Sequence, residues 1–173
     1  GVHGFNSLRL KDAIKWSSGK FLPARGQHGG PHPVYGGNGI NGWHDSYLFQ
    51  SPPLIVRRVG AYCGAVHVTQ PFAWVTDNAL VATLMVTGLT LDYLQHALRI
   101  ANLNQYSGAS GQPSISSASI GNVHLPLPPL SLQREFTSRI DQASEQVAKT
   151  RLALAVDDQL FASLQSRAFR GEL

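Results

Sequence analysis

Residues 131–173 carry the pattern that most restricts what this chain can fold into. They contain no proline and one glycine, Gly171. The segment predicts one helix that begins at Ser131, a candidate N-cap, and runs to about Phe169, with Gly171 placed to end it. At 1.5 Å per residue this helix is roughly 55 Å long, whereas a domain of about 130 residues has a radius of gyration of about 14 Å. Such a domain cannot cover the helix along its whole length.

An apolar row follows one side of the expected helix. Ten positions are spaced alternately by four and three residues from Phe136 to Ala168, and eight of them are apolar, the exceptions being Thr150 and Asp157. This is the spacing of a coiled-coil seam, in which a polar position fixes the register or offers a docking point. We therefore expect a second helix to cover the row; the alternative is a helix folded back on its own domain. The expected interface residues are Phe136, Ile140, Val147, Leu154, Phe161 and Leu164.

The first 130 residues differ in composition from the helical segment. They hold sixteen of the 17 glycines and all ten prolines, which favours short strands joined by turns. We expect an α+β fold, in which residues 1–130 form a globular domain with a mixed or antiparallel β-sheet and short helices, and residues 131–173 form one long helix in an antiparallel coiled coil. Strands are expected at residues 47–49, 54–59, 62–69, 73–76, 80–86 and 120–125, a helix after Thr90 as its cap, and loops at residues 26–42 and 102–119.

The excess positive charge also lies in the first 130 residues. They contain eight Lys and Arg and four Asp, whereas residues 131–173 contain six basic and six acidic residues, so the net charge of +4 belongs to the first part. A basic module favours a phosphate-bearing partner, although +4 is modest for a DNA-binding domain. Cys63, the one cysteine, cannot form an internal disulfide, which fits a reducing cytoplasm. No stretch approaches the roughly 20 apolar residues of a membrane span.

Two motifs resemble enzyme sites but lack the residues that would support them. Residues 37–42 (GNGING) match a GxGxxG pattern, yet no strand is expected before them and no helix after them, as a dinucleotide site needs. Residues 51–54 (SPPL) are similar to the Ser/Asn/Asp-Pro-Pro-aromatic tetrapeptide of amino-methyltransferases, but Leu54 cannot stack on a flipped base. We expect loops at both places, with neither a nucleotide cofactor nor methyl transfer.

Metal ligands and nucleophiles are not clustered in the sequence. His28 and His32 are separated by glycine and proline and do not share a helical face, and a metal site would need further ligands. The four aspartates of the first 130 residues are widely spaced, whereas a nuclease holds its metal ions with clustered carboxylates. No GxSxG segment is present. The sequence therefore predicts no catalytic residue and no metal site.

Polar and aromatic residues in the expected loops suit a DNA partner. Arg and Lys neutralise phosphates, while Arg, Asn and Gln pair with base edges. Each of these residues taken alone is an ordinary solvated loop residue, so the argument rests on the set. The candidate DNA-binding residues are Lys20, Arg25, Gln27, Tyr35, Asn38, Arg57, Arg58, Tyr62, Asn104 and Gln112.

Six segments occur in an order that is found in one known family. They are residues 33–42 (PVYGGNGING), 55–64 (IVRRVGAYCG), 74–79 (WVTDNA), 111–116 (GQPSIS), 125–136 (LPLPPLSLQREF) and 163–173 (SLQSRAFRGEL). Together they resemble, over nearly the whole chain, half of the specificity subunit of a type I restriction-modification system. The usual subunit carries two target-recognition domains and two conserved helices, whereas this chain carries one of each.

The resemblance implies a role in reading DNA. Residues 1–130 would recognise one half of a bipartite duplex site, and residues 131–173 would pack on another conserved helix and dock methyltransferase subunits. The resemblance also implies restriction subunits as partners, with S-adenosylmethionine, ATP and Mg²⁺ bound by the partner subunits and no cofactor in this chain. A chain with one helix is expected to form a homodimer, since two-fold symmetry pairs two identical helices antiparallel and reproduces the layout of the tandem subunit.

Two other functions remain open from the residues alone. One is a stand-alone DNA-modifying enzyme, which a methyl-transfer assay of the isolated chain would reveal. The other is a helical adaptor whose basic domain binds protein, which would show no salt-dependent binding to duplex DNA. The DNA target itself is not predicted, because recognition loops vary freely on one scaffold.

Overall fold

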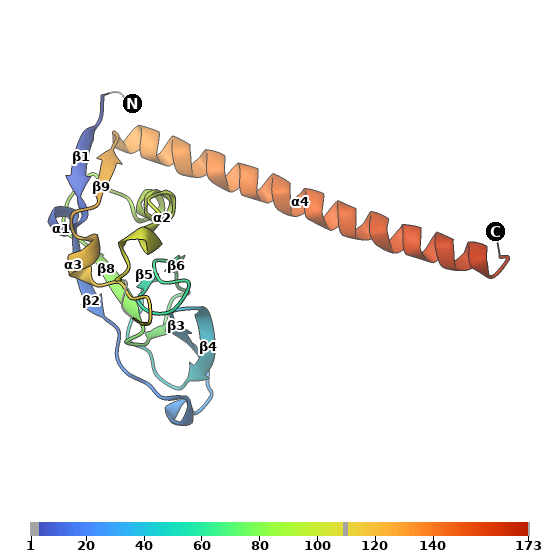
Figure 1. Cartoon of the computed structure of the whole chain (residues 1–173), viewed down its shortest axis with the longest axis horizontal. Coiled ribbons are helices and arrows are strands. Elements are labelled where there is room, and N and C mark those ends of the chain that lie inside the picture. Colours follow the sequence, from blue (N-terminus) through green and yellow to red (C-terminus); the bar gives the residue numbers. More distant parts are fainter. Residues whose placement is uncertain (1–3, 109–110, 173) are drawn as a thin grey trace. The chain divides into compact units, whose positions relative to one another are not determined.

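A computed structural model describes residues 4–108 and 111–172 of the chain. The chain divides into two compact units, residues 1–133 and 134–173. Among the described residues, the first unit contains nine strands and several short helices, and the second unit is the body of one long helix (Figure 1). This content confirms the expected α+β class.

The central sheet of the first unit has four antiparallel strands. Their order is β2 (Ile14–Ser18), β8 (Ala79–Leu84), β5 (Leu54–Arg57) and β6 (Val66–Val68). The interior strand β5 holds a run of three fully buried residues, Leu54–Val56, which is the pattern of a strand covered on both faces. The pairing of β5 with β6 confirms the hairpin expected around Gly60.

A second sheet lies in a region that was expected to be a loop. It has the order β4 (Gly39–His44), β3 (His32–Gly36) and β7 (Trp74–Val75), with β3 antiparallel to β4 and parallel to β7. The expectation of a loop over residues 26–42 is therefore wrong. The glycines belong to a tight hairpin, in which Gly39 has a φ of +96°, a conformation that glycine adopts without strain.

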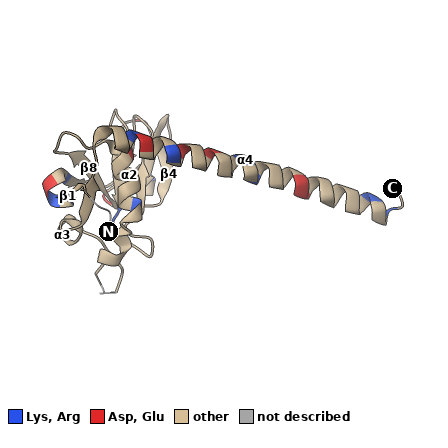
Figure 2. Ribbon diagram, turned by 90° about the horizontal axis from the view of Figure 1, so that it is seen from above, with Lys and Arg blue, Asp and Glu red and all other residues tan. Residues whose placement is uncertain are grey.

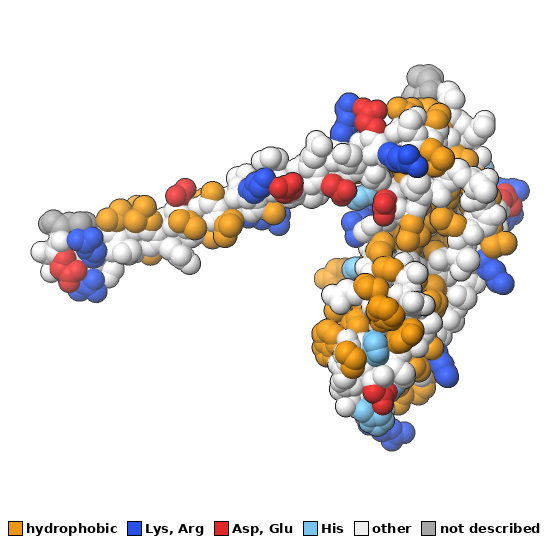
Figure 3. All heavy atoms as spheres, turned by 180° about the vertical axis from the view of Figure 1, so that it is seen from behind, with side chains coloured by type: hydrophobic (Ala, Val, Ile, Leu, Met, Phe, Trp, Pro, Cys, Tyr) orange, Lys and Arg blue, Asp and Glu red, His pale blue; other side chains and the backbone are white. Residues whose placement is uncertain are grey.

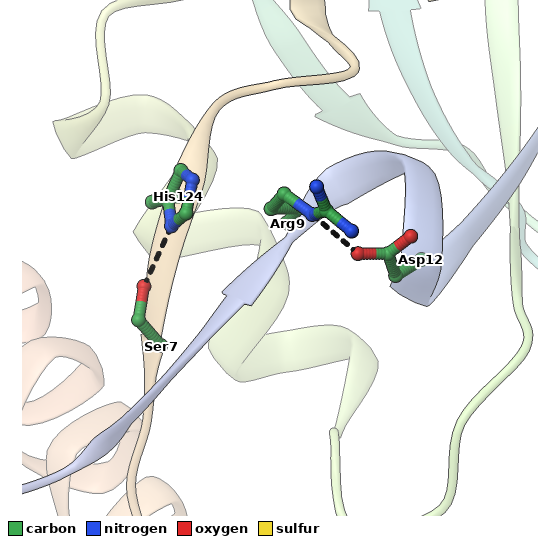
Figure 4. A network of polar contacts seen from close by, with 4 residues as sticks. All are labelled: Ser7, Arg9, Asp12 and His124. Atoms are coloured by element: carbon green, nitrogen blue, oxygen red, sulfur yellow. Dashed lines mark hydrogen bonds and ion pairs between the residues drawn. The ribbon is translucent and has the colours of Figure 1, made fainter.

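The third sheet joins the two ends of the first unit. Strand β1 (Asn6–Arg9) pairs antiparallel with β9 (His124–Leu127). Between these strands the Ser7 Oγ lies 3.1 Å from Nδ1 of His124. Arg9 Nε donates to Oδ2 of Asp12 at 2.6 Å, so the end of β1 is tied to the short helix α1 (Leu10–Ala13) that follows it (Figure 4).

The helices of the first unit are short. The longest, α2 (Leu91–Ile100), is preceded by Thr90, whose Oγ1 accepts from the backbone N–H of Tyr93 at 3.3 Å and so confirms the expected cap. Two shorter elements occupy part of residues 102–119, so the expectation of a loop there is only partly right. The remaining short elements are η1 (Ala24–Gly26), η2 (Leu103–Tyr106) and α3 (Ser117–Ile120).

The long helix, α4 (Leu130–Phe169), begins and ends through identifiable backbone contacts. It starts one residue before Ser131, so Ser131 is not its N-cap; the first bond of the helix runs from the backbone N–H of Gln133 to the carbonyl of Pro129 at 3.1 Å. At the other end Gly171 has a φ of +70°. The N–H of Glu172 donates to the carbonyl of Arg167 at 2.9 Å, which is a Schellman ending and confirms the expected stop.

The first turn of α4 is fixed to the first unit by Gln133, whose side chain is fully buried. Its Oε1 accepts from the N and Oγ1 of Thr90 at 3.0 and 3.2 Å. Its Nε2 donates to the carbonyls of Gly88 and Pro128 at 2.6 and 2.9 Å. Both acceptor and both donor positions of the amide are therefore used, as a buried amide requires.

The second unit is a single helix with its apolar row open to solvent. Val147, Leu154, Phe161 and Leu164 are all exposed, and Figure 3 shows hydrophobic side chains gathered on the helix toward its C-terminal end. Charged residues of both signs are spread along it (Figure 2), including ion pairs such as Glu145–Lys149 at 2.7 Å. In residues 4–108 and 111–172, no helix has the length and apolar character needed to cross a membrane.

Candidate nucleic-acid interface

Arg57 lies at the end of β5 and is held on three sides. Its Nε donates to the carbonyl oxygen of Val59 at 2.8 Å, and its Nη1 donates to Oδ1 of Asn38. The guanidinium carbon lies 5.8 Å from the centroid of the Tyr62 ring, where a cation is attracted to the ring face. The structure therefore brings together three of the expected DNA-binding residues.

Two glycines make room for the Arg57 side chain. A Cβ atom on Gly37 would lie 2.5 Å from Cγ of Arg57, and a Cβ atom on Gly60 would lie 2.8 Å from its Nη2. Gly60 also has a φ of +89°, which L-residues rarely adopt. The glycines of the β3–β4 turn and of the turn after β5 thus allow one arginine to pass between the two turns.

A hollow of about 210 Å³ opens beside this arginine. Its polar lining includes Asn41 and Asn78 in addition to Asn38 and Arg57. Amide and guanidinium groups are the side chains that pair with base edges through two hydrogen bonds. Asn41 shares the glycine-rich hairpin with the expected residue Asn38, whereas Asn78, which follows the strand that contains Trp74, was not expected.

Arg58 and Lys20 lie in a different environment from Arg57. Arg58 Nη1 donates to Oγ of Ser18 at 3.3 Å and to the carbonyl of Asp77 at 3.4 Å. Lys20 Nζ lies 5.8 Å from the ring centroid of Trp74. These two cations lie near the ends of β2 and β7, whereas Arg57 extends toward the β3–β4 turn.

Arg25 and Gln27 lie in and just after η1. The Arg25 side chain is exposed, as a phosphate contact would require. Gln27 packs its amide against Gly42 of β4, where a Cβ atom would overlap it. The two residues are close in sequence to each other, but no hydrogen bond within the described residues links either of them to Arg57.

Tyr35 is buried in the core and is not part of the surface. Its exposed fraction is 6%, and it belongs to a cluster with Ile55, Val75 and Val81. Its hydroxyl accepts from the backbone N–H of Gln70 at 3.0 Å. This burial removes Tyr35 from the residues that a DNA duplex can contact, because its side chain packs in the core with Ile55 of β5 and Val81 of β8.

Asn104 and Gln112 lie near the turn that carries Tyr62. Asn104 Nδ2 donates to the carbonyl of Cys63 at 3.0 Å and to that of Ala61 at 3.3 Å, so this amide braces the turn. Gln112 is exposed, and the carbonyl of the next residue, Pro113, accepts from the N–H of Gly60 at 2.9 Å. Both residues therefore adjoin the Arg57 group through backbone contacts.

His67 of β6 lies in the field of two arginines. The pKa of His67 is held below its ordinary value of 6.5, mainly by burial. The positive charges of Arg99 and Arg57 lower it further. Arg99 donates from Nη2 to the carbonyl of Val66 at 3.2 Å. The neutral imidazole is therefore favoured here, and the positive charge at this place comes from arginine. Across the described part of the chain, no three His, Cys, Asp or Glu side chains gather as they would around a metal ion.

A known family matches most of the chain. Residues 4–154 match the model of the type I restriction modification DNA specificity domain. The chain belongs to this family. Of the curated members of known function, the type I restriction enzyme EcoprrI specificity subunit of Escherichia coli is 28% identical over 138 residues, which cover 77% of this chain and 34% of that subunit.

Solved structures from type I restriction-modification systems have the same fold. One from a study of complex assembly and conformational transition of the type I R-M system has a TM-score of 0.76 at 22% identity, covering 99% of this chain and 47% of that one. The HsdS subunit from Thermoanaerobacter tengcongensis has a TM-score of 0.68 at 21% identity, covering 100% and 46%. The S subunit from M. genitalium has a TM-score of 0.71 at 13% identity, covering 84% and 40%. This specificity domain thus spans a third to a half of the proteins it matches.

Proposed function

We propose that this chain is the DNA-recognition component of a type I restriction-modification system, and that it reads one half of a bipartite duplex site without catalysis of its own. The group formed by Arg57, Asn38 and Tyr62 is the observation that carries the proposal. It presents a fixed guanidinium and an amide at one hollow, with the Tyr62 ring beside the guanidinium, in a family of DNA specificity domains. The chemistry then belongs to partner subunits.

The partners follow from the same family membership. We propose methyltransferase subunits, which would bind S-adenosylmethionine, and restriction subunits, which would bind ATP and Mg²⁺. The proposed homodimer is supported by the exposed seam of α4, which includes Leu154 and Phe161. It is also supported by length, because nearly all of this chain aligns with about half of a solved chain from a type I R-M system. In such a dimer two α4 helices pair antiparallel, and the two domains read identical half-sites in inverted order.

The first test is binding of the purified chain to duplex DNA at several salt concentrations. Affinity should fall steeply between about 50 and 200 mM salt, because phosphate contacts release counterions. Unchanged affinity over this range would contradict the proposal and favour a protein-binding adaptor. Methylation of DNA by the chain with S-adenosylmethionine alone would instead identify a stand-alone enzyme.

A further inference from the structure

The free hydrogen-bonding groups of the Arg57 side chain are all donors. Two of the five guanidinium N–H groups are used, by the carbonyl of Val59 and by Oδ1 of Asn38. Three N–H groups are left, on Nη1 and Nη2, and none of them has a hydrogen-bond partner among the described residues. Arginine has no acceptor atom. The free edge of this side chain therefore offers donors only.

The orientation of Asn38 follows from the same chemistry. A guanidinium can only donate, so the amide must turn its oxygen toward Arg57 and its nitrogen away. The Nδ2 group has no hydrogen-bond partner within residues 4–108 and 111–172, and Asn38 is exposed at the hollow beside Arg57. The pair thus adds two more donors beside the free guanidinium edge.

We infer that the Arg57–Asn38 pair reads a guanine through its major-groove edge, an inference that rests on the proposed function. Guanine presents two adjacent acceptors there, N7 and O6, which two guanidinium N–H groups can meet together, whereas adenine and cytosine each present an amino donor that the free guanidinium edge cannot accept. Thymine presents one acceptor and a methyl group. The donor-only edge of Arg57 therefore matches guanine best among the four bases.

A phosphate is the other group that accepts hydrogen bonds from arginine, and the way Arg57 is held favours a base. Contacts to Val59 and Asn38 and the ring of Tyr62 fix the plane of the guanidinium before any ligand binds. Gly37 lies against Cγ of Arg57 and Gly60 against its Nη2, so closely that a Cβ atom at either glycine would clash. A phosphate contact needs only a nearby charge, but a bidentate base contact needs a fork of fixed direction.

The test is selection from randomised duplex DNA, with the chain assembled with its methyltransferase subunits. The wild-type complex should enrich a half-site with one required guanine. Arg57→Lys keeps the positive charge and loses the paired guanidinium donors. The preference for guanine should therefore relax at that one DNA position, and affinity for the selected site should fall about 5- to 150-fold. Arg9→Ala removes a charge already paired with Asp12 and should leave the sequence preference unchanged.

A second arm uses the wild-type protein and so does not depend on a variant folding. Replacing the required guanine by 7-deazaguanine removes N7, which should weaken wild-type binding and have little effect on Arg57→Lys. Asn38→Asp keeps the acceptor for Arg57 and removes the two free donors, and it should lower the preference for guanine at the same position.

Three outcomes would overturn the inference. If Arg57→Lys weakens all sequences equally, or if 7-deazaguanine has no effect, Arg57 contacts phosphate. If the position that relaxes is not a guanine, the donor-only argument fails while DNA recognition stands. If the wild-type complex enriches no sequence at all, the proposed function itself is wrong.

Discussion

Apolar side chains have opposite surroundings in the two units of the chain. In β5, Ile55 is fully buried between neighbouring strands, whereas in α4 Leu154 and Phe161 expose 60% and 68% of their surface. The first unit therefore has a core of its own, and the second has the apolar pattern of a core without the elements that would complete it. Exposed apolar area of this kind is unfavourable in water and typical of a surface that a partner covers. The stability of the first unit should therefore depend on its buried side chains, and the state of the helix should depend on the partner that covers its apolar row.

The largest effect is expected in the helix. Replacing both Ile140 and Leu154 by Asp would place carboxylates in the apolar seam, where burying an unpaired charge is strongly unfavourable. The dimer should weaken about 100-fold or more, which sedimentation of wild type and variant at micromolar concentration would measure. Gln142→Asp with Gln159→Asp adds the same charge away from the seam and should leave the mass unchanged. If the wild-type chain is a monomer, the seam of α4 does not hold a dimer, and the proposed contrast between the two units fails.

In the first unit, the corresponding change should lower stability instead of altering assembly. Ile55→Ala deletes buried methyl groups from β5 and should lower the free energy of unfolding by about 2–5 kcal/mol. Trp16, Trp43 and Trp74 all lie in this unit, so urea unfolding followed by tryptophan fluorescence reports on it directly. Leu152→Ala, at an exposed helix position outside the seam, should change the same signal by less than about 0.5 kcal/mol.

An intermediate effect is expected where α4 begins. Gln133→Ala leaves the N–H of Thr90 and the carbonyls of Gly88 and Pro128 without their partner in a buried place. Unsatisfied buried groups should lower the free energy of unfolding by about 1–3 kcal/mol, measured by the same urea titration. Gln142→Ala, exposed on the helix, is the control. Equal stability of the two variants would show that the Gln133 hydrogen bonds contribute nothing net.

The two units also differ in how far the sequence predicts them. Helix α4 was predicted almost to the residue, because heptad spacing and the stop at Gly171 are local signals. The β3–β4 hairpin was missed, because its glycine-rich composition is also that of a loop. Burial of Tyr35 depends on strands far along the chain, as its hydrogen bond to Gln70 shows, and no local pattern predicts it.

The candidate site was predicted in its chemistry but not in its geometry. Asn38, Arg57 and Tyr62 were chosen one by one as residue types that suit DNA. Asn38 and Arg57 are 19 residues apart in the sequence, and their hydrogen bond joins two different turns. The two turns belong to different sheets, and the packing of those sheets in a shared core, which depends on the whole domain, brings the turns together. Asn78 was missed for the same reason, since only the fold places it at the hollow.

The smallest expected effect is a pH dependence of stability that should be found in the first unit and not in the dimer contact of α4. Burial, followed by the charges of Arg99 and Arg57, holds the pKa of His67 below 6.5 in the folded state. The unfolded chain therefore takes up this proton first as pH falls, so the stabilising contribution is complete above pH 6.5 and is lost progressively below it. Between pH 7.5 and 5.5, wild type should lose more unfolding free energy than His67→Gln, in which this titration is absent. All seven histidines lie in residues 1–130, and histidine is the side chain that titrates in this range, so dimer dissociation measured by sedimentation should not change over the same interval. Equal pH dependence of wild type and His67→Gln would mean that His67 does not sense the two arginines.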